Sequence, residues 1–266
     1  MYDFIYHSPK NVADAAKVLS GKEDGKLMAG GMTLIPRLKQ RLAKPSDVID
    51  LGRIAELKGI KREGNTVVIG AMTRHIDVAT SDVVKSAIPA VAQLASMIGD
   101  PAVRNRGTIG GSIANNDPAA DYPAAVLALG ATIKTNKRSI SADDFFKGLF
   151  TTALEDGEII TAVTFPIPAK AGYAKMRHPA SRFALTAVFV AKTKSGDVRV
   201  AATGASQNGV MRVSAIEAAL KANWSAAALD QIRIPDTGII ADIHGSAAYR
   251  ANLVTVMAKR AVQQAG

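Results

Sequence analysis

The chain has 266 residues, of which 48% are hydrophobic, and a formal net charge of +10. A chain of this length and apolar content buries a substantial core and favours two compact units over one. No stretch reaches the roughly 20 apolar residues that a membrane span needs, and residues 1–10 lack the pattern of a signal peptide, so we expect a cytoplasmic protein without a membrane span.

The chain contains no cysteine. Iron–sulfur clusters are held by cysteine thiolates, so the chain cannot bind such a cluster with its own side chains, and disulfides are excluded. No metal-ligand spacing and no set of nucleophile, base and acid stands out from the sequence either. We therefore predict no metal site and no catalytic side chains on this chain.

The 33 Lys and Arg residues outnumber the 23 Asp and Glu residues, which is compatible with a nucleic acid, an anionic surface or an acidic partner. Aromatic residues make up only 5% of the chain, and it has no nucleic-acid-binding motif. We therefore expect no nucleic acid ligand. The charge is interpreted as a solvated basic surface or as a surface for a protein partner.

Apolar residues recur at helical spacing over residues 12–19, and the run at 26–29 is typical of a strand. A helix over 33–42 and a buried strand over 47–51 follow. Further along the chain, the pattern predicts strands at 66–69, 132–135 and 159–165 and helices at 88–98 and 123–129. This succession indicates an α+β arrangement without internal repeats.

Pro166 and Pro168, followed by small residues up to Gly172, predict a linker. A second unit is expected after it, with strands at 173–177, 183–193 and 198–204 and helices at 213–221, 226–233 and 246–264. The predicted fold class is thus α+β, ending in a smaller unit of antiparallel sheet and helices.

Two glycine pairs in small polar sequence carry most of the functional information, Ala29-Gly30-Gly31-Met32-Thr33 and Thr108-Ile109-Gly110-Gly111-Ser112. Glycine tolerates positive φ and has no Cβ to block an approaching oxygen, so a Gly-Gly turn can direct successive N–H groups into one concavity. The neighbouring hydroxyls add donors. We expect both loops to converge on one pyrophosphate, and we expect Gly110 and Gly111 to need positive φ.

Further segments accompany the glycine loops in order: PSDVIDLGRIAELKGI, GAMTRHIDV, GDPAVRNRGTIGGSIANNDPAADYPAAVLALGA, GEIITAVTFPIP and GYAKMRHPASRFALTAVFVA. With them, essentially the whole chain resembles the FAD-binding medium subunits of molybdenum hydroxylases. This is the family of carbon monoxide dehydrogenase medium subunits and of the flavin domain of xanthine dehydrogenase. The resemblance implies FAD as cofactor, a PCMH-type FAD-binding domain at 1–170 with subdomains at about 1–55 and 56–170, and a C-terminal medium-subunit domain at 171–266.

The resemblance also implies which residues bind the cofactor. The two glycine loops match the two phosphate-binding loops, while Ile98 and Ile160 match apolar positions beside the isoalloxazine and suit a hydrophobic core equally well. Lys175 matches a lysine near the flavin, where its charge would stabilise the reduced ring, and the alternative is an ordinary surface lysine. The implied cofactor-binding residues are Ala29, Gly30, Gly31, Met32, Thr33, Leu34, Ile98, Thr108, Ile109, Gly110, Gly111, Ser112, Asn115, Asp121, Ile160 and Lys175.

Two of these polar residues have equally good local explanations. Asp121 matches an acidic residue that binds cofactor hydroxyls, but it also suits an N-cap for the helix that begins near Pro123. Asn115 belongs to a turn-rich stretch that lines the adenosine side or merely forms the turn. All four histidines lie outside the glycine loops, so we expect noncovalent FAD. The stretch from His178 to Ala184 departs from the pattern of many relatives, which leaves the flavin environment there open.

The function implied by the resemblance is electron relay: FAD accepts electrons singly from [2Fe–2S] clusters and passes them in pairs to an external acceptor such as a quinone, NAD or oxygen. The implied partners are a molybdenum-cofactor large subunit and a [2Fe–2S] small subunit, in a heterohexamer. A stand-alone FAD-dependent reductase or oxidase of the same fold is the nearer alternative, and a basic binding protein without redox activity is the more distant one. The C-terminal unit shows no substrate-binding constellation, which favours the relay.

Overall fold

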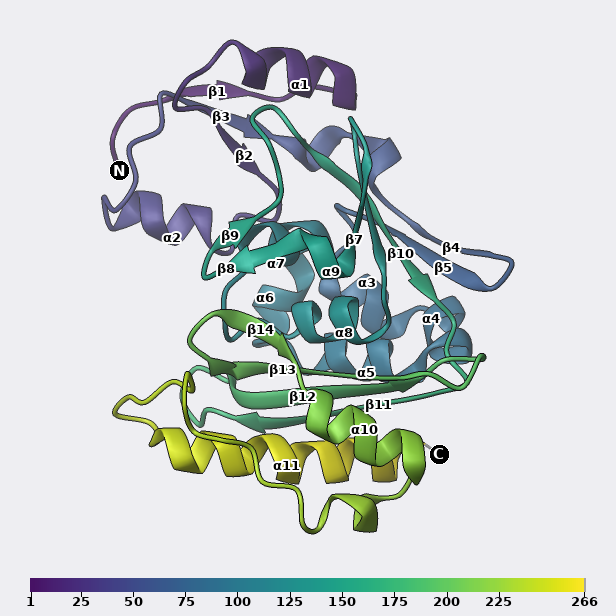
Figure 1. Cartoon of the computed structure of the whole chain (residues 1–266). Helices are drawn as coiled ribbons and strands as arrows, with labels where there is room; N and C mark the ends of the chain where they lie inside the picture. The colour runs from purple at the N-terminus through teal and green to yellow at the C-terminus, as the bar shows by residue number, and fades with distance from the viewer. Residues whose placement is uncertain (266) are drawn as a thin grey trace.

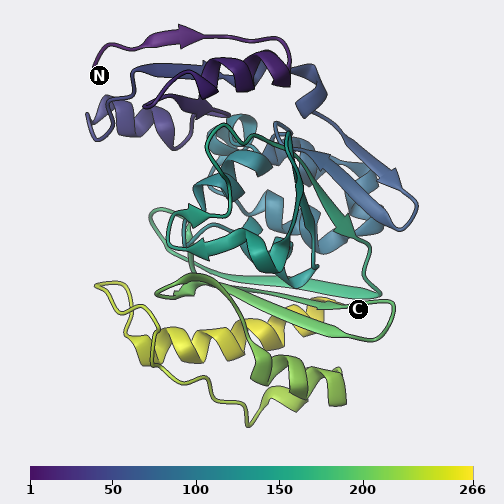
Figure 2. The same ribbon diagram turned by 45° about the horizontal axis from the view of Figure 1, so that its top comes forward.

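Three main sheets follow one another along the chain in the computed structural model, which describes residues 1–265 (Figures 1 and 2). The first has three strands in the order β1-β3-β2, the second has five in the order β4-β5-β10-β6-β7, and the third has four in the order β11-β12-β13-β14. A two-stranded ribbon, β8-β9, completes the set. Helices and largely antiparallel sheets thus form the α+β fold that the sequence predicts.

The N-terminal sheet is parallel and leads into the first glycine loop. Its elements are β1 (Ile5–His7), α1 (Val12–Ser20), β2 (Lys26–Met28), α2 (Leu34–Lys39) and β3 (Asp47–Asp50), followed by the short 3-10 turns η1 (Leu51–Arg53) and η2 (Ala55–Leu57). The apolar side of α1 buries Ala15 in a small core together with Ile49 of β3. Because β2 is held by the sheet and α2 begins at Leu34, the glycine loop between them has two fixed ends.

The middle of the chain forms an antiparallel sheet and a layer of short helices. Its strands are β4 (Ile60–Glu63), β5 (Thr66–Gly70), β6 (Thr132–Thr135), β7 (Ser139–Ser141) and β10 (Ile160–Pro166), with β8 (Phe146–Gly148) and β9 (Thr151–Thr152) in the ribbon. Its helices are α3 (His75–Thr80), α4 (Asp82–Ala87), α5 (Pro89–Ser96), α6 (Pro101–Arg106), α7 (Ile109–Asn115), α8 (Tyr122–Ala128) and α9 (Ala142–Phe145). Helix α7, which follows the second glycine loop, packs on β5 and β10.

The C-terminal sheet lies between two layers of helices, as Figure 1 shows. Its elements are β11 (Lys170–Arg177), β12 (Ala184–Lys192), β13 (Val198–Ser206), β14 (Gly209–Arg212), α10 (Ser214–Ala222), η3 (Ala226–Leu229) and α11 (Ala247–Gln264). Alternate side chains of a strand point to opposite faces. Phe189 of β12 therefore joins the core beneath α5 and α8, while its neighbours Val188 and Val190 join the core beneath α11. Burial on both faces explains the continuous apolar run of β12.

Two predicted elements differ from the observed ones. The predicted linker up to Gly172 is too long, because β11 already begins at Lys170. A Cβ on Gly172 would lie 1.9 Å from the carbonyl oxygen of Ala261 in α11, so this glycine allows close packing of helix on strand. The predicted helix over 226–233 is only the 3-10 turn η3. No helix within residues 1–265 is both long and apolar enough to cross a membrane.

Candidate functional site

The two glycine loops lie directly against each other, although almost eighty residues separate them in the sequence. A Cβ on Gly30 would lie 2.0 Å from the carbonyl oxygen of Arg106, and one on Gly111 would lie 3.3 Å from the Cβ of Ala29. The contact at Gly30 leaves no room for a side chain, and the one at Gly111 is tighter than an ordinary van der Waals contact. The convergence that the sequence predicts is therefore present, and glycine is what permits it.

The first loop presents free backbone donors. Gly31 has a φ of +76°, a left-handed conformation that suits glycine. Within residues 1–265, the backbone N–H groups of residues 31–34 have no protein acceptor. Unpaired N–H groups in a turn are an anion-binding arrangement, so this loop has the geometry that a phosphate needs.

The second loop differs from our prediction in its backbone. Thr108 is the N-cap of α7, and its Oγ1 accepts from Gly111 N at 3.1 Å. The N–H of Ile109 donates to Thr73 O, and that of Gly110 donates to Ala71 O. The first three N–H groups of α7 thus already have acceptors. Ligand contacts from this loop consequently fall to side-chain hydroxyls and to the open surface of the glycines.

The expected positive φ at Gly110 and Gly111 is also wrong, since both residues are helical. Gly110 is required for space instead, because a Cβ there would lie 2.6 Å from the Cβ of Ala71. A Cβ on Gly111 would lie 3.0 Å from Thr108 Oγ1. Two glycine pairs that look alike in the sequence therefore meet different physical requirements.

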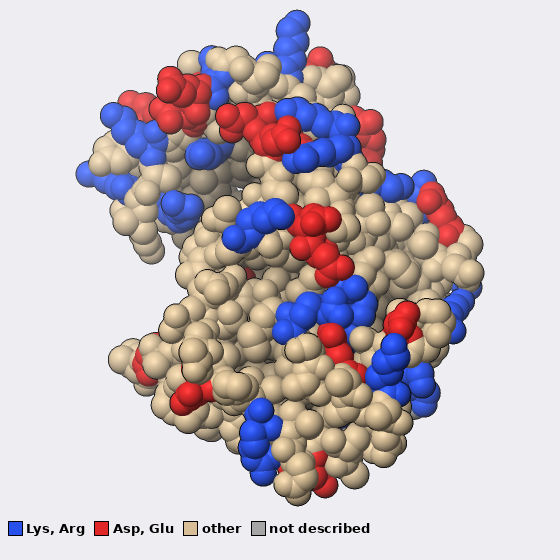
Figure 3. All heavy atoms as spheres, viewed as in Figure 1, with Lys and Arg blue, Asp and Glu red and all other residues tan. Residues whose placement is uncertain are grey.

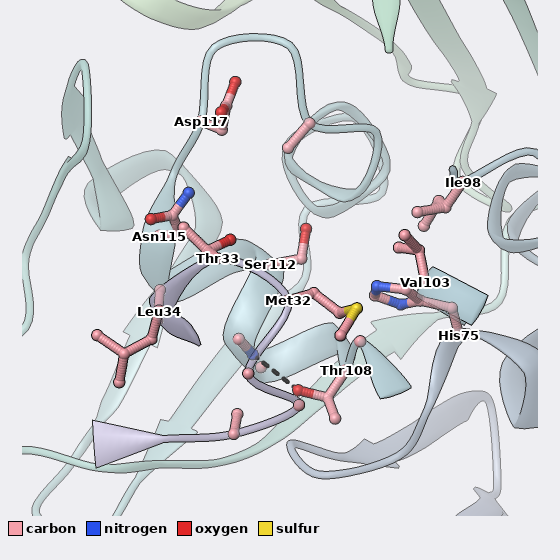
Figure 4. Close-up of a pocket in the computed structure, with 18 of the residues that line it drawn as sticks. Met32, Thr33, Leu34, His75, Ile98, Val103, Thr108, Ser112, Asn115 and Asp117 are labelled. Carbon is pink, nitrogen blue, oxygen red and sulfur yellow. Dashed lines mark hydrogen bonds between the residues drawn. The ribbon is translucent and has the colours of Figure 1, made fainter. Parts of the chain in front are cut away.

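A cavity of about 760 Å³ lies beside the two loops, which form part of its wall. This volume lies within the range of pockets that bind small molecules and cofactors. Figure 4 shows the side chains of Met32, Ser112 and His75 directed toward the space between the loops and Ile98, with the Thr108 cap bond below them. Met32 is the most exposed hydrophobic residue of the first loop.

Most of the predicted cofactor-binding residues line this cavity. They are Ala29, Gly30, Gly31, Met32, Thr33, Leu34, Ile98, Thr108, Gly110, Gly111, Ser112, Asn115, Asp121 and Ile160. Ile109 is not at the cavity wall, because its side chain is fully buried in the core beneath α7. Lys175 does not line the cavity either.

Lys175 instead forms a buried ion pair with Asp121, at 2.8 Å, and donates to the backbone oxygen of Met97 at 3.2 Å. Asp121 also accepts from the hydroxyl of Tyr173. Burial and the Asp121 carboxylate raise the pKa of Tyr173, so its phenol stays protonated and donates. Asp121 stands at the N-cap position of α8 but makes no cap hydrogen bond with its side chain, so the capping alternative is wrong. Lys175 is not a surface lysine.

Several residues of the cavity wall were not among the predicted cofactor-binding residues, although the flavin environment from His178 to Ala184 was left open. His75 at the start of α3 and the loop from Ala180 to Phe183 both line it. Arg182 in that loop has a φ of +61°, and Phe183 is half exposed. No spacing rule marks these residues in the sequence, because they reach the cavity through packing between distant elements. The segment around His75 was recognised only as part of the resemblance.

Glu158 is another unpredicted residue of the wall. Hydrogen bonds from Arg138, chiefly, lower the pKa of Glu158 to about 2, so its carboxylate stays ionised. Within residues 1–265, no group of three or more His, Cys, Asp and Glu side chains is placed to hold a metal ion. Figure 3 shows Lys and Arg side chains interspersed with Asp and Glu on one face of the molecule, as is typical of a solvated surface.

The comparison with protein families agrees with this geometry. A cavity of this size lined by two glycine loops is typical of a cofactor-binding protein. Residues 2–168 match the family model described as the FAD-binding domain in molybdopterin dehydrogenase. The chain belongs to this family, and its cofactor is FAD.

Known proteins resemble the chain over nearly its whole length. The carbon monoxide dehydrogenase medium chain of Hydrogenophaga pseudoflava is 37% identical, covering 98% of this chain and 96% of that one. The nicotine 6-hydroxylase medium subunit of Paenarthrobacter nicotinovorans is 36% identical with the same coverage. The solved structure of reconstituted CO dehydrogenase from Oligotropha carboxidovorans matches with a TM-score of 0.91 at 34% identity, covering 99% of this chain and 98% of that one. The relatives' names, dehydrogenase and hydroxylase, and the family description, molybdopterin dehydrogenase, agree with the oxidoreductase class that the sequence resemblance implies.

Proposed function

We propose that this chain holds FAD noncovalently in the cavity between its glycine loops and serves as the electron-transfer subunit of a molybdenum hydroxylase. The observation that carries the proposal is the row of backbone N–H groups at residues 31–34, which belong to the cavity wall and have no acceptor within residues 1–265. These donors would hold the pyrophosphate without a lysine. Thr33 and Ser112 add hydroxyl donors at the same place.

The remaining wall would orient the rest of the cofactor. Apolar Ile98 and Ile160 suit the flat faces of an aromatic ring system, and the buried carboxylate of Asp121 suits hydroxyl groups. Lys175 would act on the cofactor through Asp121 and through the backbone next to Ile98, since it does not reach the cavity. Bound FAD would supply the change from one-electron to two-electron transfer.

Two observations support the proposed partners: the chain has no cysteine, and its relatives are named as subunits of larger enzymes. Without cysteine it cannot ligate an iron–sulfur cluster, so electrons would come from a [2Fe–2S] small subunit. Relatives named medium chain or medium subunit belong to multi-subunit enzymes, and we propose that a molybdenum-cofactor large subunit completes a heterohexamer. We also propose that the FAD-binding domain spans 1–170 and the C-terminal domain 171–266.

The cofactor site is tested on the purified chain. We expect it to take up FAD, acid precipitation to release the yellow chromophore, and Thr33→Val to weaken binding without unfolding the protein. A chain that cannot be reconstituted with FAD would overturn the site. FAD that remains attached after acid precipitation would overturn its noncovalent character.

The relay is tested by comparing the isolated chain with the assembled complex in rapid-mixing spectroscopy. We expect no flavin reduction in the isolated chain by hydroxylase substrates such as carbon monoxide, aldehydes or purines. In the complex, removal of FAD should slow electron transfer to the acceptor while the iron–sulfur centres are still reduced. Substrate-dependent flavin reduction in the isolated chain would support a stand-alone flavoenzyme instead.

A further inference from the structure

His75 lies at a junction between the cavity and the second glycine loop. It is the first residue of α3, and its backbone N–H donates to Gly107 O at 2.9 Å, one residue before Thr108. Its ring packs against the ring of Tyr122 in α8, with centroids 5.4 Å apart. Both His75 and Gly107 line the cavity. The imidazole is therefore held in place from two sides and meets the cavity on a third.

The chain makes room for this ring at Gly107. The φ of Gly107 is −61°, which any residue adopts, so backbone conformation does not require glycine there. A Cβ at this position would, however, lie 2.6 Å from Nε2 of His75. Glycine thus allows the Nε2 edge of the imidazole to lie beside the start of the second loop.

The imidazole is polar, almost fully buried and incompletely paired. Only 4% of His75 is exposed, and Nδ1 is enclosed without a hydrogen-bond partner within the described residues. Leaving a buried polar group unpaired costs free energy, so the imidazole would gain from a ligand that pairs with its other nitrogen. Nδ1 is closed off, so Nε2 is the nitrogen with access to the cavity.

The charge state of His75 follows from its surroundings. Burial, together with the nearby guanidinium of Arg104 in α6, lowers the pKa of His75 to about 4. Tyr122, from α8, contributes no charge, because burial raises its pKa far above the ordinary value. His75 is therefore neutral at physiological pH, and its single ring proton is available to an acceptor.

We propose that His75 is a further FAD-binding residue, whose Nε2–H donates to an oxygen of the bound cofactor from the wall beside the second glycine loop. The proposal rests on the placement of FAD proposed above. It gives the second loop a donor that its own backbone lacks, because the first N–H groups of α7 already have protein acceptors.

The test separates cofactor binding from folding by measuring FAD dissociation constants and apoprotein melting temperatures. His75→Leu should raise the Kd for FAD about tenfold, the effect of one lost hydrogen bond. Its apoprotein should melt at the same or a higher temperature, since an unpaired polar atom has been removed. His75→Gln should recover part of the affinity, and His75→Phe replaces the leucine variant if that protein does not fold.

Tyr122→Phe is the matched control, because it keeps the ring packed against His75 and removes only a hydroxyl outside the cavity wall. It should bind FAD with the wild-type Kd. A wild-type Kd in the apolar His75 variants would overturn the inference, and so would a loss of affinity that merely parallels a lower apoprotein melting temperature. Wild-type protein that takes up no FAD would instead overturn the proposed function itself.

The pH dependence gives a second readout. A neutral donor keeps its strength, so the ratio of Kd values between His75→Leu and wild type should stay constant from about pH 5.5 to 8. A ratio that falls toward one as the pH rises would mean that a charged imidazole binds the cofactor, which contradicts the proposed neutral donor.

Discussion

The two glycine loops look alike in the sequence and differ in almost every physical respect. In the first loop, Gly31 adopts a left-handed conformation, and the N–H groups of residues 31–34 have no acceptor in the described part of the chain. In the second loop, the glycines are helical, the N–H groups already have acceptors, and Gly110 packs against Ala71. The first loop thus keeps backbone donors without a protein acceptor within residues 1–265, whereas the second loop uses its first three donors in the fold. A Gly-Gly pair therefore indicates close approach, but not what approaches it.

The largest effect is expected at Gly30, where the two loops meet. In Gly30→Ala, the new Cβ would overlap the backbone oxygen of Arg106, which cannot rotate away. We expect a loss of about 3 kcal/mol in the free energy of unfolding and no detectable FAD binding. Urea unfolding and FAD titration measure both. Wild-type affinity in this variant would show that the loops need not touch.

Substitutions at Gly110 and Gly111 should separate effects on stability from effects on FAD binding within the second loop. In Gly110→Ala the new methyl group meets Ala71, so we expect a loss of about 2 kcal/mol in stability. Gly111→Ala is the matched control, because it adds the same group to the same helical turn but faces Thr108 and Ala29. Its apoprotein should keep its stability to within about 1 kcal/mol, and its FAD affinity should fall. Equal stability losses in the two variants would contradict this division.

Acid should lower the free energy of unfolding of the chain through His75. The pKa of His75 is about 4 in the folded chain, against 6.5 ordinarily, so below pH 6.5 the unfolded chain binds a proton that the folded chain does not. Stability is then lost as the pH falls from 6.5 toward 4, by about 2 kcal/mol at pH 5. Urea unfolding at pH 7 and pH 5 should show this loss in the wild type and a smaller loss in His75→Leu. Identical losses would mean that His75 is hydrated and titrates normally.

The smallest effect concerns the two threonines. Thr108→Val removes the acceptor for Gly111 N and should cost about 1 kcal/mol of apoprotein stability. Thr33→Val should cost almost nothing, because the Thr33 side chain makes no cap hydrogen bond to α2. FAD affinity should nevertheless fall in the Thr33 variant. A stability loss of the same size at Thr33 would show that the Thr33 side chain also supports the fold.

Local patterns predicted much of the fold. Helix α1, strand β5 and the long helix α11 follow from apolar periodicity over a few turns or residues, which needs no tertiary information. Errors arose where a distant contact overrides the local signal. Residues 170–172 look like a linker, but pairing with β12 and contact with α11 make them a strand.

The sequence by itself determined the two glycine loops, the apolar periodicity of many helices and strands, and the absence of cysteine. It also identified the family and its cofactor. Tertiary structure alone decided which loop keeps free N–H groups, that Lys175 is buried against Asp121, and that His75 stands in the cavity wall. The physical reason is the same in each case. Hydrogen-bond partners and burial depend on residues dozens of positions away, and no local pattern encodes which distant group comes to lie within 3 Å.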